Sequence, residues 1–189
     1  MQRKLKPENS VELLEVFREL MEHIGTLGWT PEIKGYVWFK LEEAIIDAFK
    51  PKIETYKITW NDIDQALSQL QSLGIRVEVQ HSDTEYYGVD VPTAITLAKM
   101  FPGRFRPWQR EKYDCDDYAR EFKAWMAKFG VTSVAGAEGY TPLGYHAFNL
   151  MFFKSRGTCF PMFVEPQLSK LWNTKKMSKL HYLPRKLLL

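Results

Sequence analysis

Two apolar segments in the C-terminal half constrain the fold of this chain more than any other feature. Residues 145–153 and 159–165 are rich in aromatic side chains, and the segment from Lys154 to Thr158 separates them. Aromatic residues favour strands, and Gly157 in the connection can adopt the positive φ that tight hairpin turns require. The pattern therefore predicts two adjacent strands joined by a hairpin.

A helical pattern precedes this hairpin. Asp114 is a favourable N-cap residue, so Cys115 takes the first position of the expected helix, and Gly130 follows its end. Apolar residues between them recur at helical spacing, which gives the helix one buried face. The residues of this face are Tyr118, Phe122, Trp125, Met126 and Phe129. A helix beside a sheet predicts an α+β fold.

The N-terminal half has the pattern of a helical region. Apolar residues at helical spacing predict helices from Ser10 to Gly28, from Gly35 to Phe49 and from Thr59 to Gly74. Residues 75–79 alternate between apolar and polar side chains and predict a short strand. Nothing in this half points to a specific chemistry.

The charge of the chain is divided unevenly along its length. The 189 residues carry a formal net charge of +3, but residues 1–88 have 10 basic against 15 acidic side chains, and residues 89–189 have 16 against 8. We therefore expect a helical N-terminal region over 1–88 and a second region over 89–189. Six basic residues and no acidic one follow from Lys170 onward, which predicts a solvated basic tail.

Composition excludes several classes of protein. Only two cysteines occur, so the chain is no disulfide scaffold, and no apolar run reaches the roughly 18 residues of a membrane span. The first residues carry charge but no apolar h-region, so we expect no secretory signal, a cytoplasmic location and reduced thiols. No RNP-like motif, zinc-finger spacing or Gly-rich basic repeat occurs, so nucleic acid is not an expected partner.

The residues around Cys115 indicate a thiol in an electrostatic conflict. The positive end of a helix dipole favours the thiolate, which is the nucleophilic form of cysteine. Asp114, Asp116 and Asp117 flank the thiol in the sequence and disfavour that charge. A nearby imidazolium or a bound cation would be needed to offset them. The alternative is that the aspartates serve only as partners of the helix dipole.

The expected hairpin supplies an imidazole. If its turn centres on Ser155 and Arg156, His146 and Glu165 lie opposite one another on the same face of the sheet. A carboxylate bonded to one nitrogen of an imidazole orients the other nitrogen toward a nucleophile. Cys115 at a helix start, a histidine on a strand and an acid on the next strand have the order found in papain-like and transglutaminase-like acyl-transfer enzymes.

Three short motifs together resemble the protease domain of the Marasmius oreades agglutinin family. They are Asp114-Cys-Asp-Asp-Tyr-Ala119, His146-Ala-Phe-Asn149 and Val164-Glu-Pro-Gln167, and Trp108 agrees as well. The resemblance covers residues 100–170 and does not extend to the sugar-binding β-trefoil of the agglutinin. It implies a papain-like or transglutaminase-like catalytic core, with the helix that starts at the cysteine packed on an antiparallel sheet and a helical N-terminal extension.

The resemblance also implies the roles of individual residues. It makes Cys115 the nucleophile, His146 its general base and Glu165 the residue that orients His146. Gln109 lies where papain-like enzymes carry an oxyanion-hole glutamine. Calcium, or manganese in its place, would be the activating metal, which suits carboxylate and carbonyl oxygen ligands. The implied ligands are Asp116, Asp117, Gln167 and the carbonyl oxygen of Trp108.

The function predicted first is a calcium-dependent cysteine peptidase acting on a protein or peptide substrate. Cell-wall amidohydrolases and transglutaminase-like acyl transferases are alternatives with the same chemistry, although no Ser-Gly follows Cys115 and Glu165 stands where Asp is usual. The alternative from a different class is a catalytically silent, metal-stabilised binding or assembly module, encoded by a phage or another virus. Cys159 lacks a base of its own and is expected in the core.

Overall fold

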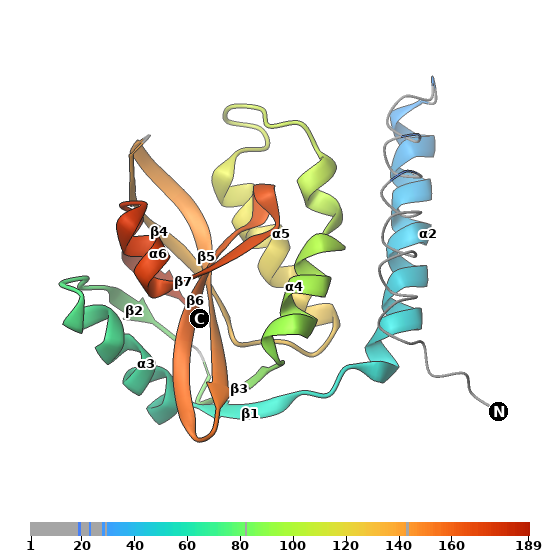
Figure 1. Ribbon diagram of the computed structural model, residues 1–189. Helices are drawn as coiled ribbons and strands as arrows, with labels where there is room; N and C mark the ends of the chain where they lie inside the picture. The colour runs from blue at the N-terminus through green and yellow to red at the C-terminus, as the bar shows by residue number, and fades with distance from the viewer. Residues whose placement is uncertain (1–18, 20–22, 24–27, 29, 82, 143) are drawn as a thin grey trace. The chain divides into compact units, whose positions relative to one another are not determined.

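A computed structural model describes residues 19, 23, 28, 30–81, 83–142 and 144–189 (Figure 1). The chain divides into two compact units, Met1–Ala48 and Phe49–Leu189. The helix α2 (Pro31–Phe49) is the one predicted from Gly35 to Phe49, and it begins four residues earlier than expected. The helix predicted from Ser10 to Gly28 lies outside the described residues except at positions 19, 23 and 28.

The second unit is built on a mixed six-stranded sheet. In spatial order the strands are β2 (Glu78–Gln80), β8 (Leu183–Leu188), β4 (Val134–Thr141), β5 (Gly144–Ser155), β6 (Thr158–Glu165) and β7 (Lys170–Asn173). Neighbouring strands are antiparallel except β2 and β8, which are parallel. A separate two-stranded sheet joins β1 (Tyr56–Thr59) to β3 (Glu85–Gly88). The predicted α+β class is confirmed, whereas the large sheet is mixed rather than wholly antiparallel.

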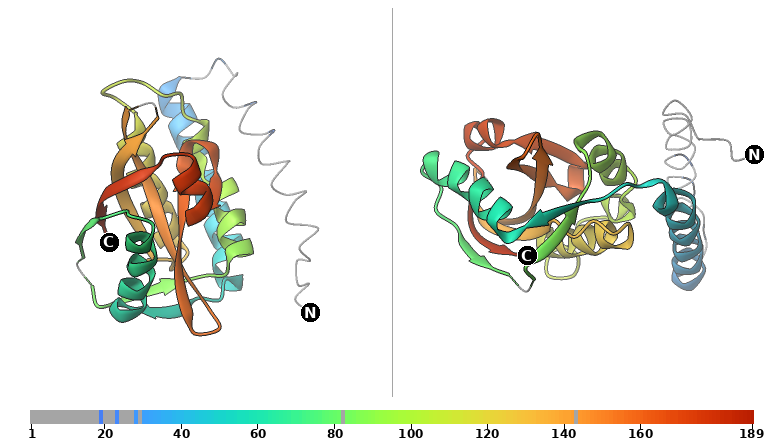
Figure 2. Two further views of the ribbon diagram at one scale, coloured as in Figure 1. Left: turned by 60° about the vertical axis from the view of Figure 1, so that its left-hand side comes forward. Right: turned by 90° about the horizontal axis from the view of Figure 1, so that it is seen from below.

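Helices pack on the two faces of this sheet (Figures 1 and 2). The helix α3 (Trp60–Ser72) packs against β6 and β5, and α5 (Cys115–Lys128) packs against β5 and β4. Successive side chains of a strand point to opposite faces. Phe148 of β5 accordingly belongs to the core under α3, and its neighbour Asn149 bonds to α5.

The other helical elements are shorter. They are α4 (Val91–Lys99), α6 (Thr174–Lys179) and the single-turn 3-10 segments η1 (Lys50–Lys52), η2 (Pro102–Phe105) and η3 (Pro166–Leu168). Of these, η3 packs against α5 and η2. None of the described helices is long and apolar enough to cross a membrane.

Local sequence signals set where the two packing helices begin. Thr59 caps α3, and its backbone N–H donates to Asp62 Oδ2 over 2.8 Å. Gly74 follows that helix with a φ of +77°, a conformation that glycine adopts without strain. Asp114 is the N-cap of α5, and its backbone N–H donates to Asp117 Oδ2 over 3.1 Å. Both helices therefore begin where the sequence predicts.

The hydrophobic core joins α3 to strands of the C-terminal half. Ile63 of α3 packs in one buried cluster with Phe148 of β5 and Phe163 of β6. Apolar burial of this extent is the main stabilising contribution to a fold of this size. The second unit therefore includes residues 49–88, which the sequence analysis assigned to a helical N-terminal region over 1–88.

The hairpin between β5 and β6 has a different register from the expected one. Its turn consists of Arg156 and Gly157, with φ values of +48° and +78°. The turn thus centres one residue beyond Ser155–Arg156, and every strand pairing moves by two residues. Because side chains alternate with a period of two, this shift leaves His146 and Glu165 on the same face of the sheet.

The basic C-terminal segment is part of the fold rather than a solvated tail. Residues 170–189 form β7, α6 and β8, and β8 lies between β2 and β4 in the sheet. Met177 and Leu187 are 0% exposed, so apolar residues among the lysines anchor the segment. The prediction of a solvated tail is wrong, because it rested on the basic residues alone, whereas the apolar residues between them are buried in the fold.

Candidate active site

Cys115 occupies the first position of α5, as predicted, and its side chain is half-buried. The buried face of the helix holds this position. Tyr118 and Phe122 are 3% and 0% exposed, and Trp125 Nε1 donates to the carbonyl oxygen of Leu97 over 2.9 Å. Apolar packing and this hydrogen bond therefore fix α5, and with it the thiol, against its neighbours.

The surroundings of Cys115 raise the pKa of its thiol. Burial has the largest effect, and the negative charges of Asp114 and Asp116 add to it. The backbone N–H of Ala147 acts in the opposite direction, because it hydrogen-bonds to the sulfur and favours the thiolate. These surroundings therefore favour the thiol over the thiolate. The electrostatic conflict expected from the sequence is present in the folded protein.

His146 and Glu165 form a hydrogen-bonded pair between β5 and β6. His146 Nε2 lies 2.9 Å from Glu165 Oε2, and the two side chains are 20% and 5% exposed. Because the carboxylate engages Nε2, Nδ1 is the ring nitrogen left for another group. The proximity predicted from the sequence is confirmed, although the register that led to it differs.

The thiol lies beside the strand that carries His146. One of its hydrogen-bond donors is the backbone N–H of Ala147, which directly follows His146. Among the described residues, the His146 side chain bonds to Glu165 and not to Cys115. Catalytic hydrogen bonds are often long before substrate binds. The structure therefore pairs His146 with Glu165. It places the Cys115 thiol, on α5, next to Ala147, the residue of β5 that follows His146.

A pocket of about 250 Å³ opens beside the His146–Glu165 pair. Its lining residues are Thr141, Tyr145, His146, Glu165, Gln167, Leu168 and Tyr182. Tyr145 and Leu168 are 58% and 55% exposed and present apolar surface to solvent. A concave site with apolar walls and a few polar groups can hold a side chain of a bound peptide.

Tyr182 is a residue of this pocket that the sequence analysis missed. Its ring packs edge-on against His146, with ring centroids 6.2 Å apart. Burial and the negative charge of Glu165 raise the pKa of its hydroxyl. His181 before it has a φ of +56°, and the Tyr182 backbone N–H donates to the Met177 carbonyl oxygen over 3.1 Å. This left-handed helix end sets the direction of the chain at Tyr182, and no local sequence pattern predicts it.

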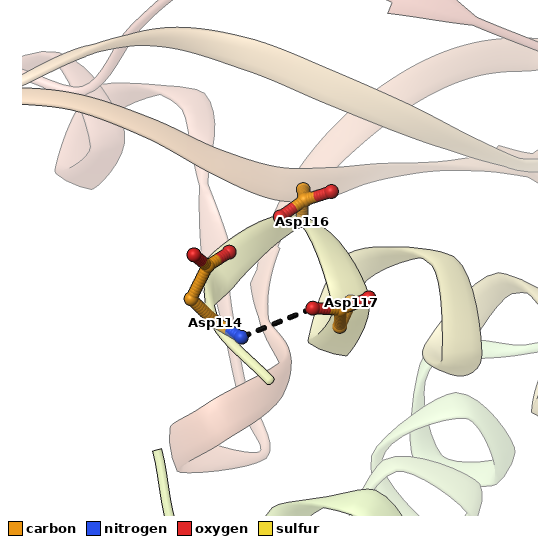
Figure 3. A group of neighbouring side chains, drawn as sticks. All are labelled: Asp114, Asp116 and Asp117. Atoms are coloured by element: carbon orange, nitrogen blue, oxygen red, sulfur yellow. Dashed lines mark hydrogen bonds between the residues drawn. The ribbon is translucent and has the colours of Figure 1, made fainter. Parts of the chain in front are cut away.

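Three aspartates form a compact group at the start of α5 (Figure 3). Single carboxylate oxygens of Asp114, Asp116 and Asp117 lie within 4.8 Å of one another. Arg120 pairs with this group, at 2.6 Å from Asp116 Oδ2 and 2.8 Å from Asp117 Oδ1. Arg120 was not among the site residues predicted from the sequence, although it lies four and three residues after these aspartates, the spacing at which helix side chains meet.

Asp114 and Asp116 are close enough to share a proton. The hydrogen bond between their carboxyl groups lowers the pKa of Asp114 and raises the pKa of Asp116. Two carboxylates in contact behave in this way because their like charges repel. A cation can relieve this repulsion, so the group could bind a metal ion with a preference for oxygen ligands.

The remaining predicted site residues lie on two nearby segments. Trp108 is 56% exposed on the loop before α5, and the Gln109 backbone N–H on the same loop donates to the Tyr113 carbonyl oxygen over 2.8 Å. Gln167 belongs to η3 and lines the pocket together with His146. In the part of the chain that the structure describes, no hydrogen bond joins Trp108, Gln109 or Gln167 to the aspartates.

Comparison with known proteins identifies the fold. No protein-family model and no curated protein matches the sequence. The structure of PSL1a in complex with E64 is similar, with a TM-score of 0.59 at 21% identity over 70% of this chain and 51% of that chain. A Polyporus squamosus lectin bound to a human-type influenza-binding epitope has a TM-score of 0.55 at 19% identity over 70% and 49%. The chain therefore spans about half the length of each of these proteins and shares the fold of that part.

Proposed function

We propose that this chain is a calcium-dependent cysteine peptidase that uses Cys115, His146 and Glu165. The observation that carries the proposal is the 2.9 Å contact between His146 Nε2 and the buried Glu165 carboxylate, beside the thiol at the start of α5. The fold supports it, because the similar PSL1a structure has a papain-like domain in complex with E64. The substrate implied by this chemistry is a protein or peptide.

The three residues have different roles in the proposed mechanism. Glu165 holds His146 through Nε2, so Nδ1 takes the proton of the Cys115 thiol. The thiolate attacks the carbonyl carbon of the scissile peptide bond, and the imidazolium gives the proton to the departing amine nitrogen. His146 then removes a proton from water, the resulting hydroxide attacks the thioester carbon, and the acid leaves as the thiol is restored.

The start of α5 also offers a donor for the oxyanion that forms on the substrate carbonyl. The first N–H groups of an α-helix lack carbonyl partners within the helix, so we propose the backbone N–H of Cys115 as the first donor. We propose the Gln109 side chain on the preceding loop as the second donor. Donors aimed at a developing negative charge stabilise the transition state more than the substrate.

The proposed calcium ligands are Asp116, Asp117, Gln167 and the carbonyl oxygen of Trp108, with Asp114 beside them. Oxygen ligands of this kind suit calcium, and manganese accepts them as well. The proximity of the Asp114, Asp116 and Asp117 carboxylates fits this assignment, because closely spaced carboxylates favour a cation. When bound, the ion would offset the aspartate charges that raise the pKa of Cys115.

Selective alkylation of Cys115 tests the proposal. In the presence of calcium, iodoacetamide should modify Cys115 at least about tenfold faster than Cys159, because the thiolate is the reactive form. Cys159 is buried, with its pKa raised to about 11. A chelator should slow the reaction of Cys115 and leave Cys159 unchanged, as measured by mass spectrometry of tryptic peptides. Slow and equal labelling of both thiols with calcium present would contradict the proposal.

Arg120 is expected to compete with the metal ion. Arg120→Ala removes the positive charge paired with Asp116 and Asp117, so the carboxylates repel one another more strongly. We expect a lower Tm without calcium and a larger rise of Tm on adding calcium than in the wild type. Calorimetry over a calcium series measures both. Arg76→Ala, at an exposed position of the same unit, is the control, and an equal calcium response of the two variants would exclude competition.

A catalytically silent, metal-stabilised binding or assembly module is the second candidate function. The raised pKa of Cys115 favours it, because the thiol stays protonated unless a cation or imidazolium intervenes. Such a module would show a calcium-dependent rise of Tm without selective reactivity of Cys115. Release of fragments from peptidoglycan but not from casein would instead indicate a cell-wall amidohydrolase.

A further inference from the structure

We propose that Asn149 is a positioning residue that fastens the helix bearing Cys115 to the strand bearing His146. The inference rests on the proposed function, because it concerns the alignment of that nucleophile with that base. Asn149 lies on β5, three residues after His146, and is 0% exposed.

The side-chain amide of Asn149 makes two hydrogen bonds that link three elements. Nδ2 donates to the Ala119 carbonyl oxygen of α5 over 3.0 Å and to the Ala135 carbonyl oxygen of β4 over 3.2 Å. Ala119 follows Cys115 by about one turn of helix. One buried amide therefore connects β4 and β5 to the end of α5 that carries the thiol.

A second polar link between α5 and the sheet lies further along the helix. Lys123 Nζ donates to the Leu188 carbonyl oxygen of β8 over 3.0 Å, at an exposed position. The remaining packing of α5 on the sheet is largely apolar, and apolar contacts carry little directional information. Apart from the contact of the Ala147 backbone N–H with the Cys115 sulfur, the Asn149 amide is the buried hydrogen-bonding group of the sheet that reaches α5 nearest its start, among the described residues.

The unpaired half of the same amide argues against a role in packing alone. Asn149 Oδ1 is buried and has no hydrogen-bond partner among the described residues. An unpaired buried acceptor is unfavourable, and an apolar side chain of similar volume would avoid it. Only the Nδ2 group of the Asn149 amide has hydrogen-bond partners among the described residues. The two Nδ2 contacts are therefore the reason for an amide at this position.

The consequence concerns the spacing of the reacting groups. A movement of α5 along β5 would displace Cys115 from His146, because each belongs to one of the two elements. Reaction rates depend steeply on such displacements, since a near-attack geometry has to be reached in every turnover. Asn149 acts on the reaction through this alignment and touches no reacting atom.

Asn149→Leu tests the proposal, with Ser133→Ala as the matched control. Ser133 is also 0% exposed, and its Oγ donates to the Phe152 carbonyl oxygen of β5 over 3.0 Å without reaching α5. Both variants should lower the Tm. Asn149→Leu should lower kcat and the alkylation rate of Cys115 by at least about tenfold with KM within about twofold of the wild type. Ser133→Ala should leave all three within about twofold.

Amide hydrogen exchange gives a readout that does not require an active enzyme. Peptides covering residues 115–122 should exchange faster in Asn149→Leu than in the wild type, and at the wild-type rate in Ser133→Ala. If the wild-type thiol is unreactive, the proposed function fails while this exchange still tests the role of Asn149. Equal exchange and equal Cys115 labelling in the two variants would overturn the inference. Asn149→Thr, which keeps one donor, replaces Asn149→Leu if that variant does not fold, and the same ordering is expected.

Discussion

Replacing His146 with glutamine should reduce peptide hydrolysis by about 10³-fold or more. In the proposed mechanism His146 removes the proton of Cys115 and later delivers it to the leaving amine, so one substitution removes both steps. Glutamine keeps a polar side chain opposite Glu165, which limits damage to the pocket. Initial rates of casein hydrolysis in calcium, with circular dichroism spectra to verify folding, measure the effect.

His81→Gln is the matched control for this substitution. His81 is exposed, and its ring stacks on Trp60 with centroids 3.9 Å apart, away from the pocket-lining residues. Its hydrolysis rate should stay within about twofold of the wild type, as expected for a surface position. A loss of less than tenfold in His146→Gln would show that His146 is not the general base.

Replacing Trp125 with alanine should destabilise the second unit by about 3–5 kcal/mol. Trp125 is 2% exposed, packs edge-to-face on Phe129 at 4.9 Å between centroids and bonds to the Leu97 carbonyl oxygen of α4. The substitution leaves a cavity between α5 and α4 and an unpaired carbonyl group. Urea unfolding followed by far-ultraviolet circular dichroism gives the change in the free energy of unfolding.

Trp108→Ala, measured without calcium, is the control. It shows whether the loss of stability in Trp125→Ala comes from the burial of Trp125 or from the loss of any tryptophan. Trp108 is 56% exposed, so the loss of its side chain should change the free energy of unfolding by less than about 0.5 kcal/mol. If Trp125→Ala and Trp108→Ala lowered the free energy of unfolding by similar amounts, α5 would not pack as described.

The helix that carries the thiol was predictable because its signals are local. The N-cap Asp114 and the apolar spacing after Cys115 lie within one stretch of sequence, and the helix begins at the predicted residue. The start of α3 at Thr59 was predictable for the same reason. In both cases neighbouring residues determine the backbone, so no knowledge of the tertiary fold was needed.

The pairing of His146 with Glu165 was predicted from a turn that is displaced by one residue. The pairing survives because the displacement moves the register by two, which is the period of a strand. A displacement of the register by one residue would have separated the two side chains. The sheet face that His146 and Glu165 share was therefore predictable. The exact strand register was not, because it depends on which residues of the turn between β5 and β6 adopt a positive φ.

The parts of the site that come from distant segments were not predictable. Tyr182 reaches the pocket through a left-handed residue after α6, and Arg185 and Lys186 belong to a strand inside the sheet instead of a tail. The many basic residues after Lys170 suggest a solvated segment when the strands that pair with it are unknown. Only the pairing of β8 with β2 and β4 shows where the segment lies.

The place of β8 between β2 and β4 has a consequence for the order of folding. β2 ends at Gln80 and β8 begins at Leu183, so this contact closes a loop of about 100 residues. Contacts between such distant residues slow folding, because the entropy of loop closure is lost before the contact forms. We therefore expect β2 and β4 to stay unjoined during synthesis until residues 183–188 have emerged. Tyr182 precedes that strand directly, so one wall of the pocket would be completed in the same late step.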